Sequence, residues 1–167
     1  AIDDVTPTAF EEANALLGSI DDVNGADGNY GIRYTLADVV GSGFTFDYFY
    51  THQHGAGDAN ADNGTSGAIA NDNGEAYEVV VKGNVPGVEG LAIGAGYAVL
   101  KETTATSGAS KDQDEGTAYV TYAYGPVKVG YQLGAVADGS NNQYKNQYAG
   151  ISYAVSDDLS VSFNQIE

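Results

Sequence analysis

Eight stretches of this 167-residue chain alternate between apolar and polar residues with a period of two. The clearest is VKVGYQL, residues 127–133, which places Val, Val, Tyr and Leu on one side and Lys, Gly and Gln on the other. Successive side chains of a β-strand point to opposite faces of its sheet, so each stretch predicts a strand with one apolar and one polar face. The expected strands are residues 30–38, 43–52, 75–83, 90–101, 116–124, 126–136, 143–155 and 158–166.

The connections between these strands alternate in length. Short turns with Gly, Pro or Asp, such as NVPGVEG and YGP, alternate with longer polar connections. An up-and-down barrel in an outer membrane has tight turns at one end and longer loops at the other, whereas a soluble sandwich has no need of this order. Strands of about 9–11 residues also suit a tilted bilayer crossing, against a mode of about 5–6 in globular proteins. We therefore expect an all-β fold, a transmembrane antiparallel up-and-down β-barrel.

The polar faces of the strands favour the membrane interpretation. In a wide barrel they line a water-filled lumen, and the apolar faces meet lipid. This predicts that Val127, Val129 and Leu133 point outward. The strand at 143–155 is expected to need a bulge near Tyr148 or Ala149 to keep its faces sorted. Tyr residues cluster near strand ends, as at a membrane interface, in the pairs Tyr48 and Tyr50, Tyr122 and Tyr124, and Tyr144 and Tyr148.

Composition excludes several classes of protein. The net charge of −17 argues against nucleic acid as a partner, and the absence of Cys excludes disulfide scaffolds and thiolate metal sites. No apolar run approaches the ~20 residues of a membrane-spanning helix, but barrel strands cross membranes without such a run. His52 and His54 lack both a third metal ligand and a nucleophile motif, so neither a metal centre nor an enzyme is expected.

One helix is expected before the strands, in TPTAFEEANALLG, residues 6–18. Thr6 can cap it, Pro7 suits its first turn, and Gly18 can end it. Glu11 and Glu12 favour the early turns because the amino end of a helix attracts negative charge.

The Tyr- and Gly-rich acidic strands, the phrase GISYAVSDDLSVSF and the opening acidic helical segment resemble general-diffusion porins of alpha-proteobacteria, of the Rhodobacter type. In that family sixteen-stranded barrels form trimers, and a loop with a short helix folds inward and constricts the pore. The resemblance implies that residues 1–29 end this loop and that residues 30–167 form strands six to thirteen. Family members are roughly twice as long, and outer-membrane barrels usually end on an aromatic residue rather than on FNQIE, so we expect a partial chain lacking five strands before it and three after it.

The resemblance also implies a location and a function. The protein would be a homotrimer in the outer membrane of a Gram-negative bacterium, in contact with membrane lipid and lipopolysaccharide. It would let small polar solutes and ions diffuse passively through a water-filled pore. Such a pore filters solutes electrostatically, since opposite charges across a narrow aqueous gap create a transverse field.

Basic residues on the barrel wall would face an acidic inward loop in this family. Arg33 is the best match by position, because it is the first base on the wall after the loop. The alternative is that these residues are ordinary solvated charges near strand ends. The candidate pore-lining residues are Arg33, Lys82, Lys128, Asp47 and Glu78 on the strands and Glu11, Glu12, Asp21 and Asp22 on the loop.

The segment DANADNG, residues 58–64, resembles the start of an EF-hand calcium loop. Asn63 stands where such a loop needs Gly, and Ile69 stands where it needs Glu, which rejects an EF-hand. Looser calcium binding stays open as a weak hypothesis, and no other cofactor is expected. Its ligands would be Asp58, Asn60, Asp62 and Asp72.

Two other interpretations stay open. One is a soluble, acidic, extracellular or surface-layer β protein or adhesin with calcium-binding loops. The other is a small closed eight-stranded outer-membrane barrel, whose lumen its own side chains would fill.

Overall fold

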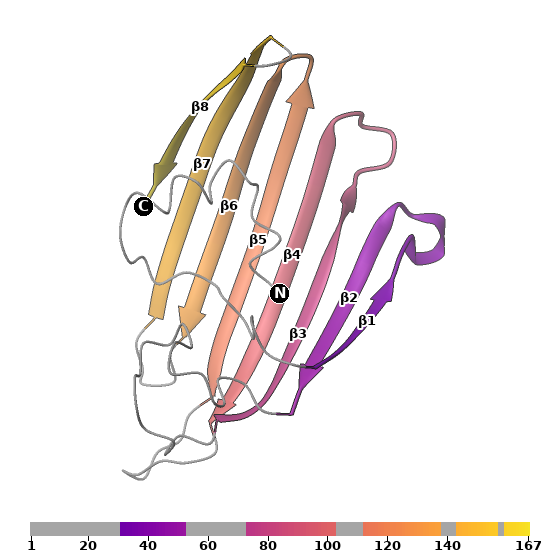
Figure 1. The fold of residues 1–167 in the computed structure, drawn as a ribbon, viewed down its shortest axis with the longest axis vertical. Coiled ribbons are helices and arrows are strands. Elements are labelled where there is room, and N and C mark those ends of the chain that lie inside the picture. The colour runs from indigo at the N-terminus through magenta and orange to yellow at the C-terminus, as the bar shows by residue number, and fades with distance from the viewer. Residues whose placement is uncertain (1–30, 53–72, 103–111, 138–142, 157–158) are drawn as a thin grey trace.

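The structure, a computed structural model, describes residues 31–52, 73–102, 112–137, 143–156 and 159–167. These residues form one antiparallel sheet of eight strands in which each strand pairs with the next along the chain (Figure 1). The strands are β1 (Ile32–Leu36), β2 (Phe44–Thr51), β3 (Asn73–Asn84), β4 (Leu91–Glu102), β5 (Gln113–Tyr124), β6 (Val127–Ala137), β7 (Gln143–Ser156) and β8 (Leu159–Ile166). A single 3-10 turn among the described residues, η2 (Val39–Gly41), joins β1 to β2.

The all-β, up-and-down prediction is confirmed, and all eight strands lie where the alternation predicts them, with ends that differ by a few residues. The largest differences are that β5 begins three residues before the expected start at 116, that β3 begins two before 75, and that β1 is two residues shorter at each end than the expected 30–38. The helix predicted over residues 6–18 lies outside the described residues. Nothing in the described ranges is a helix long and apolar enough to span a membrane.

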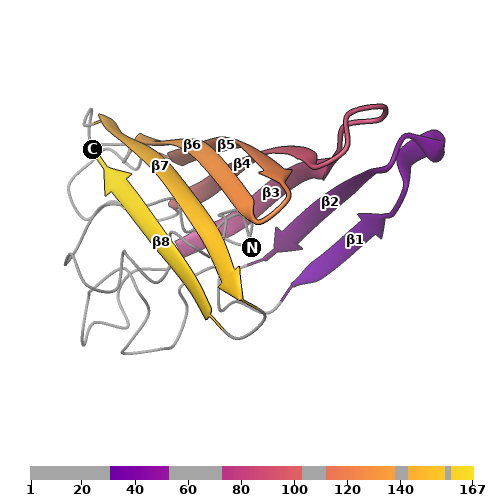
Figure 2. The same ribbon diagram turned by 90° about the horizontal axis from the view of Figure 1, so that it is seen from above.

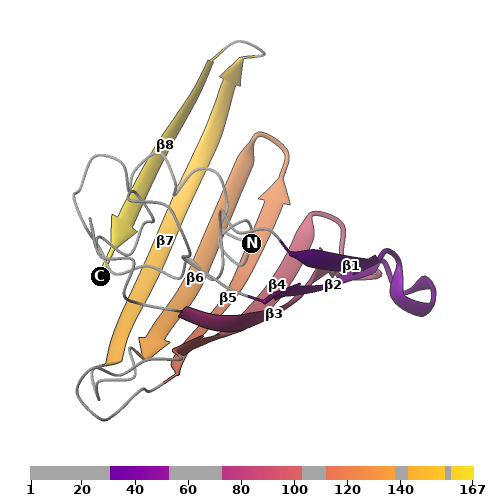
Figure 3. The same ribbon diagram turned by 60° about the horizontal axis from the view of Figure 1, so that its bottom comes forward.

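The sheet curves into a trough, with β1 and β8 at its two free edges (Figures 2 and 3). Within the described ranges β1 pairs only with β2, and β8 pairs only with β7. The sheet is therefore open, and these eight strands do not form the small closed barrel that was one of the alternatives.

In a soluble protein the apolar face of a sheet is buried and the polar face is exposed. In this sheet the apolar face is the exposed one. Strand register assigns each side chain to a face, and the polar alternates lie on the concave face while the apolar alternates lie on the convex face. Leu133 and Val129 on the convex face are exposed, whereas Gln132 between Tyr131 and Leu133 is buried on the concave face. Strand register also places Val127 on this face, so the outward direction predicted for Val127, Val129 and Leu133 is confirmed. The buried polar residues, all concave, are Asp47, Thr51, Glu78, Glu115, Thr117, Thr121, Gln132 and Asn146.

The core also lies on the concave face. It is a small cluster of Ala76, Val80, Ala98, Leu100 and Val136, against which Phe49 and Tyr119 pack. The apolar core is therefore much smaller than the apolar surface of the convex face, where large exposed side chains occupy every strand except β2.

The bulge predicted near Tyr148 or Ala149 is wrong. The pairing of β7 with β6 runs without interruption past Tyr148, which is completely buried on the concave face. Glycines surround it: Gly150 follows on its own strand, and Gly130 and Gly134 flank Gln132, the residue opposite it on β6. These missing side chains leave room for the ring, so no bulge is needed to turn Tyr148 outward. Tyr144 shares this face, so neither Tyr144 nor Tyr148 belongs to an outward aromatic cluster.

The actual irregularities lie near strand ends. Register shifts occur between Asn73 and Ala76 in β3 and between Ala154 and Ser156 in β7. Bulges at such places bend a strand and increase its twist, which suits a sheet that curves.

The hairpins are staggered by a constant step. Each hairpin ends in a last pair of opposed residues next to its turn. This pair lies three residues further along the strand direction than the last pair of the preceding hairpin. The steps run from Val81 to Asn84 on β3, from Thr121 to Tyr124 on β5 and from Tyr153 to Ser156 on β7. Three residues every two strands correspond to about 5 Å per strand, against a strand spacing of about 4.8 Å. The line of turns is therefore inclined by about 45° to the strand normal, near the upper end of the strand tilt typical of barrels.

Candidate functional site

The concave face carries an ion pair that links β1 to β2. The guanidinium of Arg33 lies 3.1 Å from Asp47, Nη2 to Oδ2, and its Nε donates to Oδ1 at 3.2 Å. Thr35, directly opposite Asp47, donates its hydroxyl to the same oxygen. Asp47 is buried, while half of the Arg33 side chain remains exposed. The carboxylate thus fixes the guanidinium in an orientation that leaves part of its charge accessible.

Lys82 is a second base on the same face, diagonally across from Asp47. It lies opposite Thr45 on β2, two residues from Val80, the partner of Asp47, and it is half-buried on the concave face. Arg33, Asp47 and Lys82 therefore form one cluster, here called the wall cluster, with one acid and two bases. The sequence proposed all three as lumen residues, and the structure brings them together on the concave face.

Lys128 and Glu78 lie on the same face but outside the wall cluster. Lys128 is exposed between Ala123 and Ser152, near the turn that joins β5 to β6. Glu78 is only 2% exposed, so it does not present its carboxylate to solvent as a solvated lumen residue would.

Glu115 also belongs to this face, although it lies outside the strand expected over residues 116–124. It lies level with Glu78 across Ala98, is equally buried, and accepts a hydrogen bond from Gln113 at 2.6 Å. The expected strand began at residue 116, which left Glu115 in a loop. Extending the period of two backward from Thr117 would have placed Glu115 on the concave face.

Large exposed apolar and aromatic side chains form an apolar band across the convex face. The band includes Leu133 at 47% and Phe163 at 70% exposed. Its exposed members are Ile32, Tyr34, Leu36, Val81, Ile93, Tyr97, Val120, Tyr122, Val129, Tyr131, Leu133, Ile151, Tyr153, Val161 and Phe163.

Tyrosine hydroxyls mark one border of the apolar band. On the side of the longer connections, here called the loop side, Tyr97 donates to Asp114 at 2.6 Å and Tyr131 donates to Gln147 at 2.7 Å. Tyr50 donates to Glu75 at 3.4 Å. Each acceptor lies further toward the loop side than its donor, so these rings all point their hydroxyls the same way.

Glu75 is the centre of a polar group at this border, beyond the apolar band. Its Oε1 lies 3.5 Å from Lys101 Nζ, which in turn lies 5.7 Å from the centroid of the Tyr77 ring. The Tyr50 and Tyr77 rings are 5.3 Å apart. The hydrogen bond from Tyr77, followed by those from Lys101 and Tyr50, lowers the pKa of Glu75 despite partial desolvation.

The two borders of the band are parallel. The loop-side border is marked by the acceptors Glu75, Asp114 and Gln147. The opposite border, on the side of the short turns and here called the turn side, is marked by the last paired residues of the same strands, Asn84, Tyr124 and Ser156. Nine residues separate Glu75 from Asn84 and Gln147 from Ser156, and ten separate Asp114 from Tyr124. At about 3.3 Å per residue and a tilt near 45°, the band is about 22 Å high on all three strands.

The remaining candidate residues lie outside the described residues: the loop acids Glu11, Glu12, Asp21 and Asp22 and the calcium ligands Asp58, Asn60, Asp62 and Asp72. Among the residues that the structure places, no group of three or more His, Cys, Asp or Glu could hold a metal ion.

Comparison with known proteins found no matching family model, no similar curated protein and no similar solved structure.

Proposed function

We propose that this chain is part of the wall of an outer-membrane porin, a trimeric barrel of sixteen strands through which small hydrophilic solutes and ions diffuse. The observation that carries this proposal is the inverted polarity of the sheet: large apolar side chains are exposed on its convex face, and the buried polar side chains lie on its concave face.

The apolar band is difficult to reconcile with water. Monomeric soluble proteins rarely expose contiguous apolar patches larger than a few hundred Å². Burying one Val, Leu, Ile or Phe side chain is worth about 1.5–3 kcal/mol, so the ten such side chains of the band represent a large unused driving force. In a bilayer these side chains contact hydrocarbon instead of water, so their exposure costs nothing. The height of the band, about 22 Å, is near the ~25 Å apolar band of outer-membrane barrels.

The open edges support a larger barrel. In hydrocarbon each unsatisfied backbone group costs several kcal/mol, so sheets that span membranes close on themselves. Because β1 and β8 do not pair with each other, further strands are needed between them, as a sixteen-stranded barrel would provide.

The wall cluster would then face the water inside the pore. Arg33 and Lys82 supply two fixed positive charges, and Asp47 compensates one of them and holds Arg33 in place. Fixed charges between low-dielectric walls focus the electric field and favour ions and dipolar solutes over apolar ones.

Reconstitution of the complete gene product into planar bilayers tests this proposal. We expect extraction from membranes only with detergent, stepwise ion conductance, and a changed ion selectivity when Arg33 is replaced by Ala. Absence of conductance from the complete protein would overturn the pore. Solubility without detergent together with calcium-dependent melting would instead support a soluble extracellular β protein.

A further inference from the structure

Basic residues are distributed unequally over the two faces of the sheet. Of the described bases, Arg33, Lys82 and Lys128 lie on the concave face, and Lys101 and Lys145 lie on the convex face. Both convex lysines are on the loop side of the apolar band. The described turn side of the convex face has no Lys or Arg, so positive charge borders the apolar band at one end only.

Both lysines stand beyond the loop-side border of the band. On β4 this border passes about level with Leu100, midway between Val99, which pairs with Asp114 on β5, and Lys101, which contacts Glu75 on β3, so Lys101 is about one residue beyond it. Lys145 is two residues beyond the border residue Gln147. One and two residues along a strand tilted by about 45° rise about 2 Å and about 5 Å. The headgroup layer on each side of a bilayer is about 5–7 Å thick, so both ammonium groups lie at headgroup height when the band fills the hydrocarbon.

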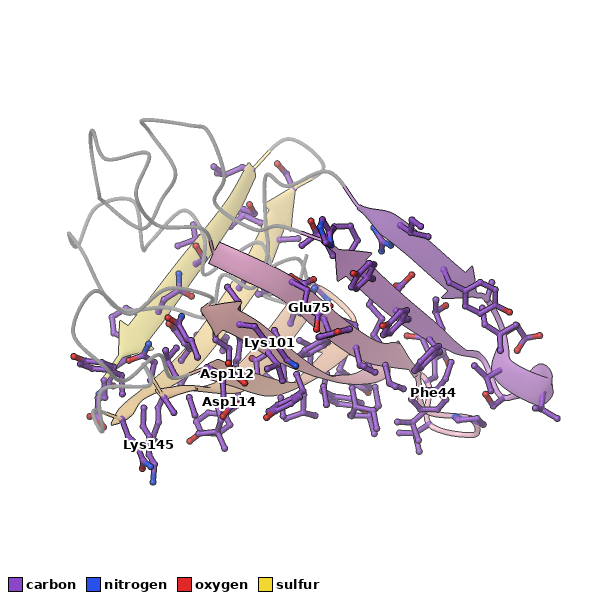
Figure 4. All side chains as sticks on the ribbon, turned by 90° about the horizontal axis from the view of Figure 1, so that it is seen from below. Phe44, Glu75, Lys101, Asp112, Asp114 and Lys145 are labelled. Carbon is purple, nitrogen blue, oxygen red and sulfur yellow. The ribbon has the colours of Figure 1, made fainter. Side chains whose placement is uncertain are left out.

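The two lysines are accessible in different ways. Lys101 is held by Glu75 and Tyr77, and 42% of its side chain remains exposed. Lys145 is exposed, has no ion pair with any other described residue, and projects from the convex side in Figure 4, as Asp114 does. Ala135 lies opposite Lys145, so a small side chain leaves room beside its ammonium group.

We propose that Lys101 and Lys145 bind the phosphate groups of anionic lipids in the leaflet on the loop side. This inference rests on the proposed function, because it requires the apolar band to lie in a bilayer. The whole chain carries a charge of −17, and the pairing of β4 with β5 places Asp112 and Asp114 beside Lys101, so anionic lipid is repelled over most of the surface. On the described convex face the two lysines are the only bases among these acids, so they supply its only positive charges. The phosphate-rich leaflet therefore lies on the side of the longer connections.

The contribution of each lysine to the affinity for anionic lipid can be estimated from simple electrostatics. A basic residue near an anionic membrane surface contributes about 1 kcal/mol, which corresponds to about fivefold in affinity. Glu75 compensates part of the charge of Lys101, so Lys145 is expected to contribute more than Lys101.

The test uses the complete gene product in detergent micelles containing either phosphatidylglycerol or phosphatidylcholine. Native mass spectrometry measures how many lipid molecules each protein retains. We expect wild type to prefer phosphatidylglycerol, and the variant Lys101→Gln with Lys145→Gln to lose between about fivefold and about 25-fold of this preference at low salt. High salt should reduce the wild-type preference, because screening shortens the range of the attraction.

Lys128→Gln is the matched control, since it removes the same charge from the concave face. An equal loss of preference in Lys128→Gln would mean that net charge, not position, attracts the lipid, and would overturn the proposal. An unchanged preference in the double variant would overturn it as well. Failure of the wild-type protein to enter micelles or bilayers at all would instead overturn the proposed porin, so the two failures are distinguishable.

Discussion

The hydroxyl of Tyr97 donates to the carboxylate of Asp114 at 2.6 Å, across the β4–β5 pair and toward the loop side. Its ring lies beside Gly116, where a Cβ atom would be only 3.8 Å from ring carbon Cδ2. The ring thus covers the glycine and carries its hydroxyl past the apolar band to a charged acceptor. An amphipathic side chain in this position has an apolar body at one level and a polar tip at the next.

Replacing Tyr97 by Phe should remove this hydrogen bond and keep the ring. We expect the free energy of unfolding in detergent to fall by about 0.5–1.5 kcal/mol, measured by denaturant titration. Tyr124→Phe is the control, because Tyr124 is 76% exposed in the last pair of the β5–β6 hairpin and should change stability by less than about 0.5 kcal/mol. Equal effects of the two variants would contradict a specific role of the Tyr97 hydroxyl.

Gly94 is required by an aromatic ring on the concave face. A Cβ atom added there would lie 2.3 Å from a ring carbon of Tyr119 on the neighbouring strand. Gly94→Ala should therefore force the ring to move and destabilise the fold by about 1–3 kcal/mol, measured by thermal unfolding.

A double-mutant cycle assigns this cost to the contact. In the background Tyr119→Ala, the change Gly94→Ala should cost much less, because the clashing ring is absent. Gly116→Ala serves as a second control, since its Cβ would be in ordinary contact with its neighbours. If the free-energy costs of Gly94→Ala and Tyr119→Ala simply add, contact with the Tyr119 ring is not what requires glycine at position 94.

The wall cluster predicts opposite changes of ion selectivity. Asp47→Asn removes the acid between Arg33 and Lys82 and should shift the reversal potential in planar bilayers toward anions. Arg33→Gln should shift it toward cations. It should also cost stability, because Asp47 stays buried with the Thr35 hydroxyl and without its guanidinium partner.

Lys128→Gln tests whether position matters within the concave face. Lys128 is exposed and lies near the β5–β6 turn, outside the wall cluster. Its loss should shift the reversal potential less than the loss of Arg33. A shift as large as that of Arg33→Gln would mean that selectivity depends on total charge alone.

Much of this architecture was predictable because a period of two assigns faces without knowledge of register. Once Val129 and Leu133 were placed on one face, Gln132 had to lie on the other, and the structure agrees. Eight strands and their order followed from the same pattern together with the turns.

The contacts between strands were less predictable because they depend on register. Arg33 and Asp47 meet only because Thr35 lies opposite Asp47, and this register depends on the conformation of the turn between their strands. That turn contains Asp38 and Val40 at positive φ, of 53° and 54°, a conformation which residue type did not indicate.

Burial of aromatic residues on the polar face was also missed. The rule that aromatic side chains belong to the apolar face led to an expected bulge at Tyr148. The glycines Gly130, Gly134 and Gly150 instead leave room for its ring on the concave face. The sequence contains these glycines, but only strand register reveals that they surround one tyrosine.

Substituting a charged residue in the middle of the apolar band tests whether the convex face meets lipid or water. Val120 is 40% exposed and lies between the border residue Asp114 and the last paired residue Tyr124 of β5. In a bilayer, Val120→Arg should destabilise the protein by about 2–4 kcal/mol, because an arginine at the midplane of a barrel must leave water. Ala135→Arg, at the loop-side border of the band, should cost only about 0–1 kcal/mol for the same substituent. Both free energies can be measured by denaturant titration in phospholipid vesicles. If the convex face instead met water, Val120→Arg would be an ordinary surface substitution within about 0.5 kcal/mol of wild type, and the two variants would not differ.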